Sequence, residues 1–112
     1  MQTKLSLLAD LFGSIEIDDD TLPAYHYQAP DACPPHYLVW SEDDRLDLEA
    51  GNVHAEKAWQ GTADLFTTID FDPFADAIES VLEDNGLWWS YEGTDYEEDT
   101  GLIHHQWLWS YA

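Results

Sequence analysis

The chain has 112 residues, 45% of them hydrophobic, with 24 acidic residues against three basic ones and a formal net charge of −21. This length and composition fit one globular domain and argue against disorder, while the charge argues against binding to DNA, RNA or an anionic membrane. The single cysteine, Cys33, excludes an intramolecular disulfide and a multi-cysteine zinc site, and no apolar run is long enough to predict a membrane span.

The first third of the chain predicts a helix followed by an extended loop. Leucines recur at helical spacing over residues 3–12, with Thr3 as an N-cap and Gly13 as a stop. An acidic run then breaks this pattern. Four prolines between Pro23 and Pro35 predict an ordered, extended loop near a sheet edge, because proline cannot donate a hydrogen bond to a strand ladder.

The middle of the chain predicts two strands. Residues 36–42 have the composition of a strand, and residues 43–52 predict a polar connection. The segment 55–68 then alternates as a long strand with one wet face. Its two faces are expected to carry Trp59, Gly61, Ala63 and Leu65 on one side and Gln60, Thr62 and Asp64 on the other.

The segment "DFDPFADAIESVLEDNG" is the strongest helix prediction. Asp72 can cap the helix, Pro73 suits its first position and Gly86 stops it. An apolar stripe at helical spacing predicts packing against the Trp59 and Leu65 face of the sheet; it consists of Phe74, Ile78, Val81 and Leu82.

Three more strands are predicted after this helix. They cover residues 87–91, 94–98 and 102–111, and the last two flank a turn at residues 99–101, where Gly101 allows positive φ. Strands in adjacent runs predict a single α+β domain over residues 1–112, with a mainly antiparallel sheet of four to five strands packed with two helices. The six tryptophans are many for this length, so we expect part of this aromatic surface to be buried against a partner.

The sequence "YEEDTGLIHHQWLW" raises the question of a metal or catalytic site, which its spacing argues against. Neighbouring residues of a strand point to opposite faces, so His104 and His105 cannot share an ion. A calcium-binding loop that began at Asp95 would need glycine at its sixth position and glutamate at its twelfth. The chain has Thr100 and Gln106 at these positions. We therefore interpret this segment as an acidic hairpin and expect no metal.

Other catalytic patterns are equally weak. The chain has no phosphate-binding glycine loop and no nucleophile-elbow motif. Cys33 has His36 nearby, but no lysine or arginine lies near it to lower the thiol pKa, so we expect a bystander thiol. Asp70 and Asp72 are explained as charges at a helix N-terminus. We expect neither an enzyme nor a cofactor.

The succession of elements after Pro34 resembles a known family. The relevant stretches are "PPHYLVWSEDDRLDLEAGN", "HAEKAWQGTADLFTTIDFDPFADAIESVLEDNGLWW" and the acidic hairpin quoted above. They are similar to the small tail-completion proteins, also called tail-terminator or head–tail joining proteins, of siphophages and prophages of Gram-positive hosts. Both the terminator and a neighbouring connector fit this resemblance, which covers roughly the last 80 residues and the general plan of the N-terminal helix.

The resemblance implies a structural subunit without chemistry. It implies a ring, commonly of six copies, that caps the tail tube in the virion and docks it to the capsid, after assembly in the host cytoplasm. The expected partners are further copies of the chain, the tail-tube protein and head–tail connector proteins, with no specific nucleic-acid binding and no membrane. We expect an acidic cluster in the lumen or on the rim of such a ring, drawn from Asp18, Asp19, Asp20, Glu97, Glu98 and Asp99.

Two other functions remain open at this point. The first is an acidic DNA mimic of the anti-restriction type, because carboxylates spaced like phosphates can occupy a DNA-binding cleft and the charge of −21 is extreme. The hydrophobic, proline-rich segment 23–40 argues against it, since a free solvated mimic does not need such a segment. The second is a small enzyme or metal protein, which metal titration tests.

Overall fold

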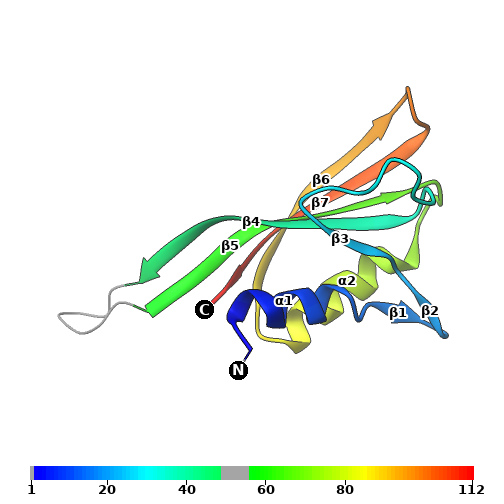
Figure 1. The fold of residues 1–112 in the computed structure, drawn as a ribbon. Coiled ribbons are helices and arrows are strands. Elements are labelled where there is room, and N and C mark those ends of the chain that lie inside the picture. The colour runs from blue at the N-terminus through cyan, green and yellow to red at the C-terminus, as the bar shows by residue number, and fades with distance from the viewer. Residues whose placement is uncertain (1, 49–55) are drawn as a thin grey trace.

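The computed structural model describes residues 2–48 and 56–112. Within these residues it contains two helices, a five-stranded sheet and a two-stranded hairpin. Both helices cover the same face of the large sheet (Figure 1). The fold is α+β with a mainly antiparallel sheet and two helices, which confirms the prediction from sequence.

The large sheet has the strand order β3-β4-β5-β7-β6. Only the β3–β4 pair is parallel among these neighbours. Strand β7 ends opposite Trp59, so β4 and β5 continue beyond it as a two-stranded arm (Figure 1). In chain order the elements are α1 (Lys4–Phe12), β1 (Glu16–Ile17), β2 (Asp20–Thr21), β3 (Ala24–His26), β4 (Tyr37–Leu48), β5 (Glu56–Thr67), α2 (Pro73–Asp84), β6 (Trp88–Glu97) and β7 (Leu102–Tyr111).

Both helices begin at the predicted caps. The Thr3 hydroxyl accepts a hydrogen bond from the Ser6 amide at 3.1 Å, and the Asp72 carboxylate accepts one from the Phe74 amide at 3.0 Å. These side chains satisfy amides that have no partner within the helix. Helix α2 ends just before Gly86, whose φ of +76° few other residues adopt without strain.

The core lies between the helices and the covered face of the sheet. Leu65 and its neighbours on that face are fully buried, as are the apolar residues of both helices that pack on them. The predicted stripe of α2 is in this cluster, with Val81 and Trp59 at its border, so the prediction of its packing is confirmed. The central members are Leu8, Phe12, Leu38, Trp40, Ala63, Leu65, Phe74, Ile78, Leu82, Trp107 and Trp109.

The domain buries more tryptophan surface than its composition suggests. Of the six tryptophans only Trp88 is exposed, at 59%. Two indole N–H groups donate to carboxylates of α2: Trp107 to Glu79 at 2.8 Å and Trp89 to Glu83 at 3.0 Å. A buried indole N–H needs a hydrogen-bond acceptor, and the glutamates of α2 provide one for each of these two rings.

Two strand boundaries differ from the prediction. The predicted strands 87–91 and 94–98 are one strand, β6, which a bulge interrupts between Tyr91 and Gly93. Gly93, at the bulge, has a φ of +137°. In the sequence pattern this irregularity resembles the end of one strand and the start of another. The predicted connection 43–52 is strand as far as residue 48, and the rest of it, like the predicted strand start at residue 55, lies outside the described residues.

Three short strands were predicted as loops. The acidic run after α1 forms the β1–β2 hairpin, and the proline-rich segment contains β3, which pairs in parallel with β4. Strands of two or three residues are too short for an alternation to be recognised. The prediction that the proline-rich segment lies at a sheet edge is confirmed, because β3 is an edge strand.

Candidate interaction surfaces

The first predicted acidic segment occupies the turn of the β1–β2 hairpin. Asp18 and Asp19 have positive φ, 49° and 67°, and Asp20 opens β2. All three are exposed. Aspartate tolerates this left-handed conformation better than most residues, because its short side chain can hydrogen-bond nearby backbone groups. The hairpin therefore presents three carboxylates to solvent.

The second predicted acidic segment forms the turn between β6 and β7. Glu97 ends β6, and its carbonyl accepts a hydrogen bond from the Gly101 amide at 2.8 Å. Gly101 has a φ of +71°, as the sequence predicts for this turn. Glu98 and Asp99 are exposed, and Glu97 is half-buried.

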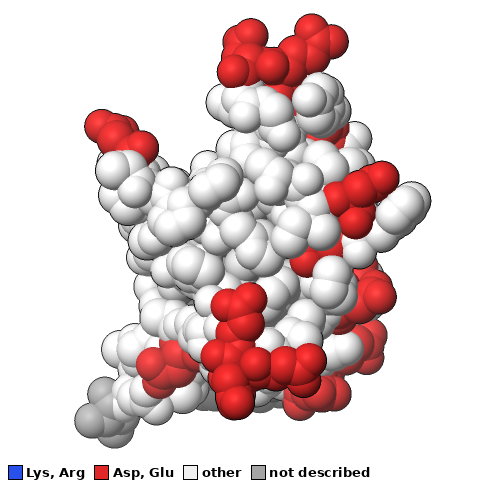
Figure 2. All heavy atoms as spheres, turned by 90° about the vertical axis from the view of Figure 1, so that its right-hand side faces the viewer, with Lys and Arg blue, Asp and Glu red and all other residues white. Residues whose placement is uncertain are grey.

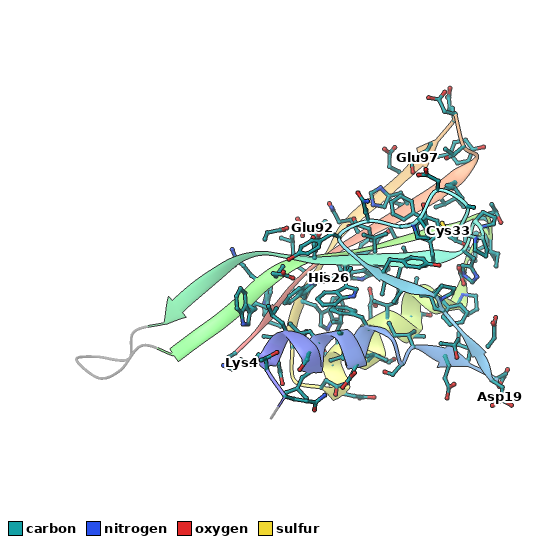
Figure 3. All side chains as sticks on the ribbon, in the orientation of Figure 1. Lys4, Asp19, His26, Cys33, Glu92 and Glu97 are labelled. Carbon is teal, nitrogen blue, oxygen red and sulfur yellow. The ribbon has the colours of Figure 1, made fainter. Side chains whose placement is uncertain are left out.

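Both acidic turns lie at the end of the molecule opposite the β4–β5 arm (Figure 1). They occupy different corners of that end, as the labelled Asp19 and Glu97 show in Figure 3. Figure 2 looks onto this end: carboxylates stand at its top, at its upper left, along its right-hand side and across its lower part, and they surround an uncharged area in the upper middle. No lysine or arginine is visible on the described part of this end. The six predicted residues thus share one end without forming one cluster.

The paired histidines point to opposite faces of the sheet, as predicted. On the open face, away from the helices, His104 Nε2 lies 2.8 Å from Asp64 Oδ1, and Gln106 donates to the same oxygen at 3.0 Å. The His104 ring stacks on Phe66, and Phe66 stacks on Tyr37, with ring centroids 4.4 and 5.0 Å apart. These residues form a polar–aromatic row across three strands.

His105 belongs to a different environment. Its Nδ1 lies 3.1 Å from the Tyr91 hydroxyl and 3.2 Å from that of Thr94, on the side of the sheet that faces the helices. Burial lowers the pKa of His105; the charge of Asp72 opposes this shift and that of His104 adds to it. Each histidine of the pair thus has its own hydrogen-bond partner.

The loop from Tyr27 to His36 passes over the open face (Figure 1) and leaves a groove of about 470 Å³. Tyr27, Tyr37 and Asp64 are among its lining residues. Burial raises the pKa of Tyr37, and the charges of Cys33 and Glu97 raise it further, so this phenol stays protonated at neutral pH and can donate a hydrogen bond. The groove therefore offers the Tyr37 hydroxyl as a hydrogen-bond donor, the Asp64 carboxylate as an acceptor and the aromatic ring faces beside them.

Cys33 lies in this loop and is half-buried (Figure 3). Its candidate base, His36, directs Nε2 to the Asp72 carboxylate at 2.7 Å and packs edge-on against Phe74. Asp72 therefore caps α2 and also holds the histidine. This confirms the capping role predicted for Asp72.

Three exposed aromatic side chains are spread along edge strand β6. Trp88, Tyr91 and Tyr96 are 59%, 43% and 59% exposed. One side of β6 pairs with β7, while its other side has no strand neighbour within the described residues. An edge strand with large aromatic side chains is a surface on which proteins associate.

Phe71, just before α2, was not singled out from sequence. Its side chain is 95% exposed and its φ is +57°, a left-handed conformation that is unfavourable for a bulky residue. An apolar residue before an N-cap usually packs on the fourth helical residue, but here that residue is Asp76. This missing apolar partner is the signal in the sequence that could have predicted its exposure.

No family model matches the chain, and no curated protein is significantly similar to it. Among the residues that the structure describes, no three histidine, cysteine, aspartate or glutamate side chains gather as metal ligands would. The helices of this described part are too short to cross a membrane. The candidate sites are therefore the acidic end, the groove, the β6 edge and Phe71.

Proposed function

We propose that the chain is a structural subunit of a bacteriophage or prophage tail, which forms a tail-completion or head–tail joining ring. The observation that carries this proposal is the β6 edge, where three large aromatic side chains remain exposed on a strand with a free side. Burial of such an edge between subunits removes apolar surface from water and satisfies strand hydrogen bonds. A ring provides this contact for every copy.

The charge distribution supports the same proposal. The end that carries both acidic turns has carboxylates and no visible basic side chain in its described part (Figure 2). Carboxylates that line a lumen repel the phosphates of passing DNA, whereas lysine or arginine would bind them. In this proposal the partners are further copies, the tail-tube protein and a connector, and no reaction is catalysed.

Deletion of the gene in the phage or prophage that encodes the chain tests this function. We expect tails without a defined end, or heads and tails that remain unjoined, in electron micrographs of lysates. A plasmid copy of the wild-type gene should restore complete particles, and a copy with Trp88→Asp and Tyr96→Asp should not. Tails of normal length joined to heads in the deletion strain would contradict the proposal.

A DNA mimic is the second candidate, and it is favoured by the several carboxylates at this end, where no basic side chain is visible on the described part. Such a protein would occupy the DNA-binding cleft of a restriction or nucleoid protein through carboxylates alone. A pull-down with purified restriction and nucleoid proteins separates the two functions. Stoichiometric, salt-sensitive capture supports the mimic, and lack of capture supports the ring subunit.

A further inference from the structure

Two hollows on the open face of the sheet adjoin at His104 and Gln106, which line both of them. The first is the groove of about 470 Å³ beside Tyr27, described above. The second has a volume of about 260 Å³ and lies beside the bulge of β6, where Gly93 contributes no side chain to fill it. The two hollows together are called the trough below, and the trough is large enough for a short peptide segment rather than a single ion.

The charged side chains of the trough are acidic. Asp64 lines the groove, and Glu92 and Asp95 line the second hollow. No lysine or arginine is among the described residues that line either hollow. Three carboxylates around a concave surface produce a negative potential, so the complementary ligand carries a positive charge.

Two of these carboxylates are held in place by neighbouring side chains. His104 Nε2 and the Gln106 amide both contact Asp64 Oδ1, at 2.8 and 3.0 Å, while Oδ2 accepts no hydrogen bond from the described residues. Glu92 Oε2 accepts a hydrogen bond from the Ser90 hydroxyl at 2.9 Å. Because these contacts fix the Asp64 carboxylate, its second oxygen is oriented for a ligand before the ligand arrives.

The Tyr27 ring adds an aromatic surface to the groove. Its side chain is 61% exposed, and its hydroxyl donates a hydrogen bond to Glu42. One face of the ring stacks on His26, with ring centroids 3.8 Å apart, and no aromatic ring of the described residues stacks on the other face. Tyr27 has a φ of +74°, a conformation that is costly for a bulky residue and that recurs in residues that clamp ligands.

We propose that the trough binds an arginine side chain on an exposed segment of a partner protein. The guanidinium group donates to Asp64 Oδ2 and lies against the open face of the Tyr27 ring. Arginine suits both contacts, because its planar group pairs with carboxylates and stacks on aromatic rings. Glu92 and Asp95 attract further basic residues of the same segment. This inference goes beyond the ring, whose contact is the β6 edge, and does not depend on it.

A pair of peptides tests the charge of the ligand on the wild-type chain. Acetyl-phenylalanyl-arginine amide is titrated into the ¹⁵N-labelled protein at 0.15 M salt, where a Debye length of about 8 Å screens distant carboxylates. We expect saturable shifts of the backbone amide signals of Tyr27, Asp64, His104 and Gln106. The citrulline counterpart has a similar shape but no charge, and it should bind about tenfold or more weakly, the effect of losing a charge-assisted hydrogen bond.

Two variants test the residues of the trough with the arginine peptide. Asp64→Asn keeps an oxygen for His104 and Gln106 but removes the negative charge, and it should weaken binding by about tenfold or more. The matched control is Asp84→Asn, which removes an exposed charge on α2, on the other side of the sheet, and should bind like the wild type. Tyr27→Asn removes the ring at a position where asparagine tolerates positive φ, and it should weaken binding by about two- to fivefold.

The results divide clearly. Weaker binding of the citrulline peptide, together with a loss in Asp64→Asn that Asp84→Asn does not share, supports the arginine site. Equal binding of the two peptides would mean that an uncharged segment occupies the trough, and equal losses in the two aspartate variants would mean general attraction to an acidic chain. Either result, or no saturable shift at the trough, would overturn the inference and leave the ring proposal standing. The comparison of peptides uses the wild-type chain, so it decides the question even if a variant does not fold.

Discussion

The two faces of the large sheet carry different kinds of side chain. The covered face is apolar and packs on both helices, with Leu65 and Trp107 completely buried. The open face carries the row of Tyr37, Phe66 and His104 with Asp64, all of them partly exposed beneath the groove loop. The covered face therefore holds the fold together, while the open face and the edges are available for partners.

Truncation on the covered face should give the largest effect. Ile78→Ala removes a completely buried side chain of α2 and should lower the free energy of unfolding by about 2–5 kcal/mol, the range for core aliphatic residues. Ser80→Ala, at an exposed position of the same helix, is the control and should change it by about 0.5 kcal/mol or less. Denaturant titration measures both, and equal effects would mean that α2 is not docked on the sheet.

A change on the open face should cost less. Asp64→Ala leaves His104 and Gln106 without their shared acceptor, but these groups are partly exposed and water can replace it, so we expect a loss of about 1–2 kcal/mol. Removal of any carboxylate also relieves repulsion in this acidic chain. Asp95 is an exposed acidic residue opposite His104 in the β6–β7 register. Asp95→Ala is therefore the control for the loss of one negative charge. If both variants have the same stability, the polar row does not contribute to folding.

The pH dependence of stability should report the burial of His105. Because the pKa of His105 lies below its ordinary 6.5 in the folded chain, the unfolded chain binds more protons once the pH falls below 6.5. The wild type therefore loses stability relative to His105→Gln between pH 7.5 and 5.5. The difference in melting temperature between the two proteins should therefore shrink or change sign as the pH falls. The change should be small, since His105 is only half-buried. Parallel melting curves would contradict this assignment.

Charge reversal of the two acidic turns should have the smallest effect on folding. Replacement of Asp18–Asp20 or Glu97–Asp99 by lysines changes exposed turns and should alter stability by about 0.5 kcal/mol or less. In the virion we expect complete particles that attach to cells but eject DNA poorly, because lysines in a lumen hold phosphates. Normal infectivity after reversal of both turns would exclude a lumen role for them.

The packing of the covered face could be predicted from sequence, whereas on the open face only the positions of single residues could be predicted and not the contacts between them. Apolar spacing in α2 and the alternation of β5 depend only on local periodicity, and both are confirmed. The meeting of Asp64 with His104 depends on the register between β5 and β7, 40 residues apart, which no local pattern specifies. Strand β3 was missed because three residues are too few for an alternation, and β6 was predicted as two strands because of the bulge between Tyr91 and Gly93.

The turn at residues 99–101 could be predicted from sequence, but the hairpin around Asp18 and Asp19 and the relation between the two acidic segments could not. The position of the predicted turn follows from turn chemistry, whereas the presence of both segments at one end of the molecule depends on how the hairpins pack (Figure 3). Phe71 was overlooked because an exposed phenylalanine has no periodic pattern. Its recognition required the observed φ and exposure.

The most direct test of the central claim is the number of copies that the wild-type chain forms in solution. Six copies carry a formal charge of about −126, so assembly should be weak at roughly 10 mM salt and stronger near 0.15 M, where the Debye length is about 8 Å. Native mass spectrometry and negative-stain microscopy of the 0.15 M sample should reveal one closed ring of about six copies. A monomer at every salt concentration, with or without tail tubes, would contradict the claim.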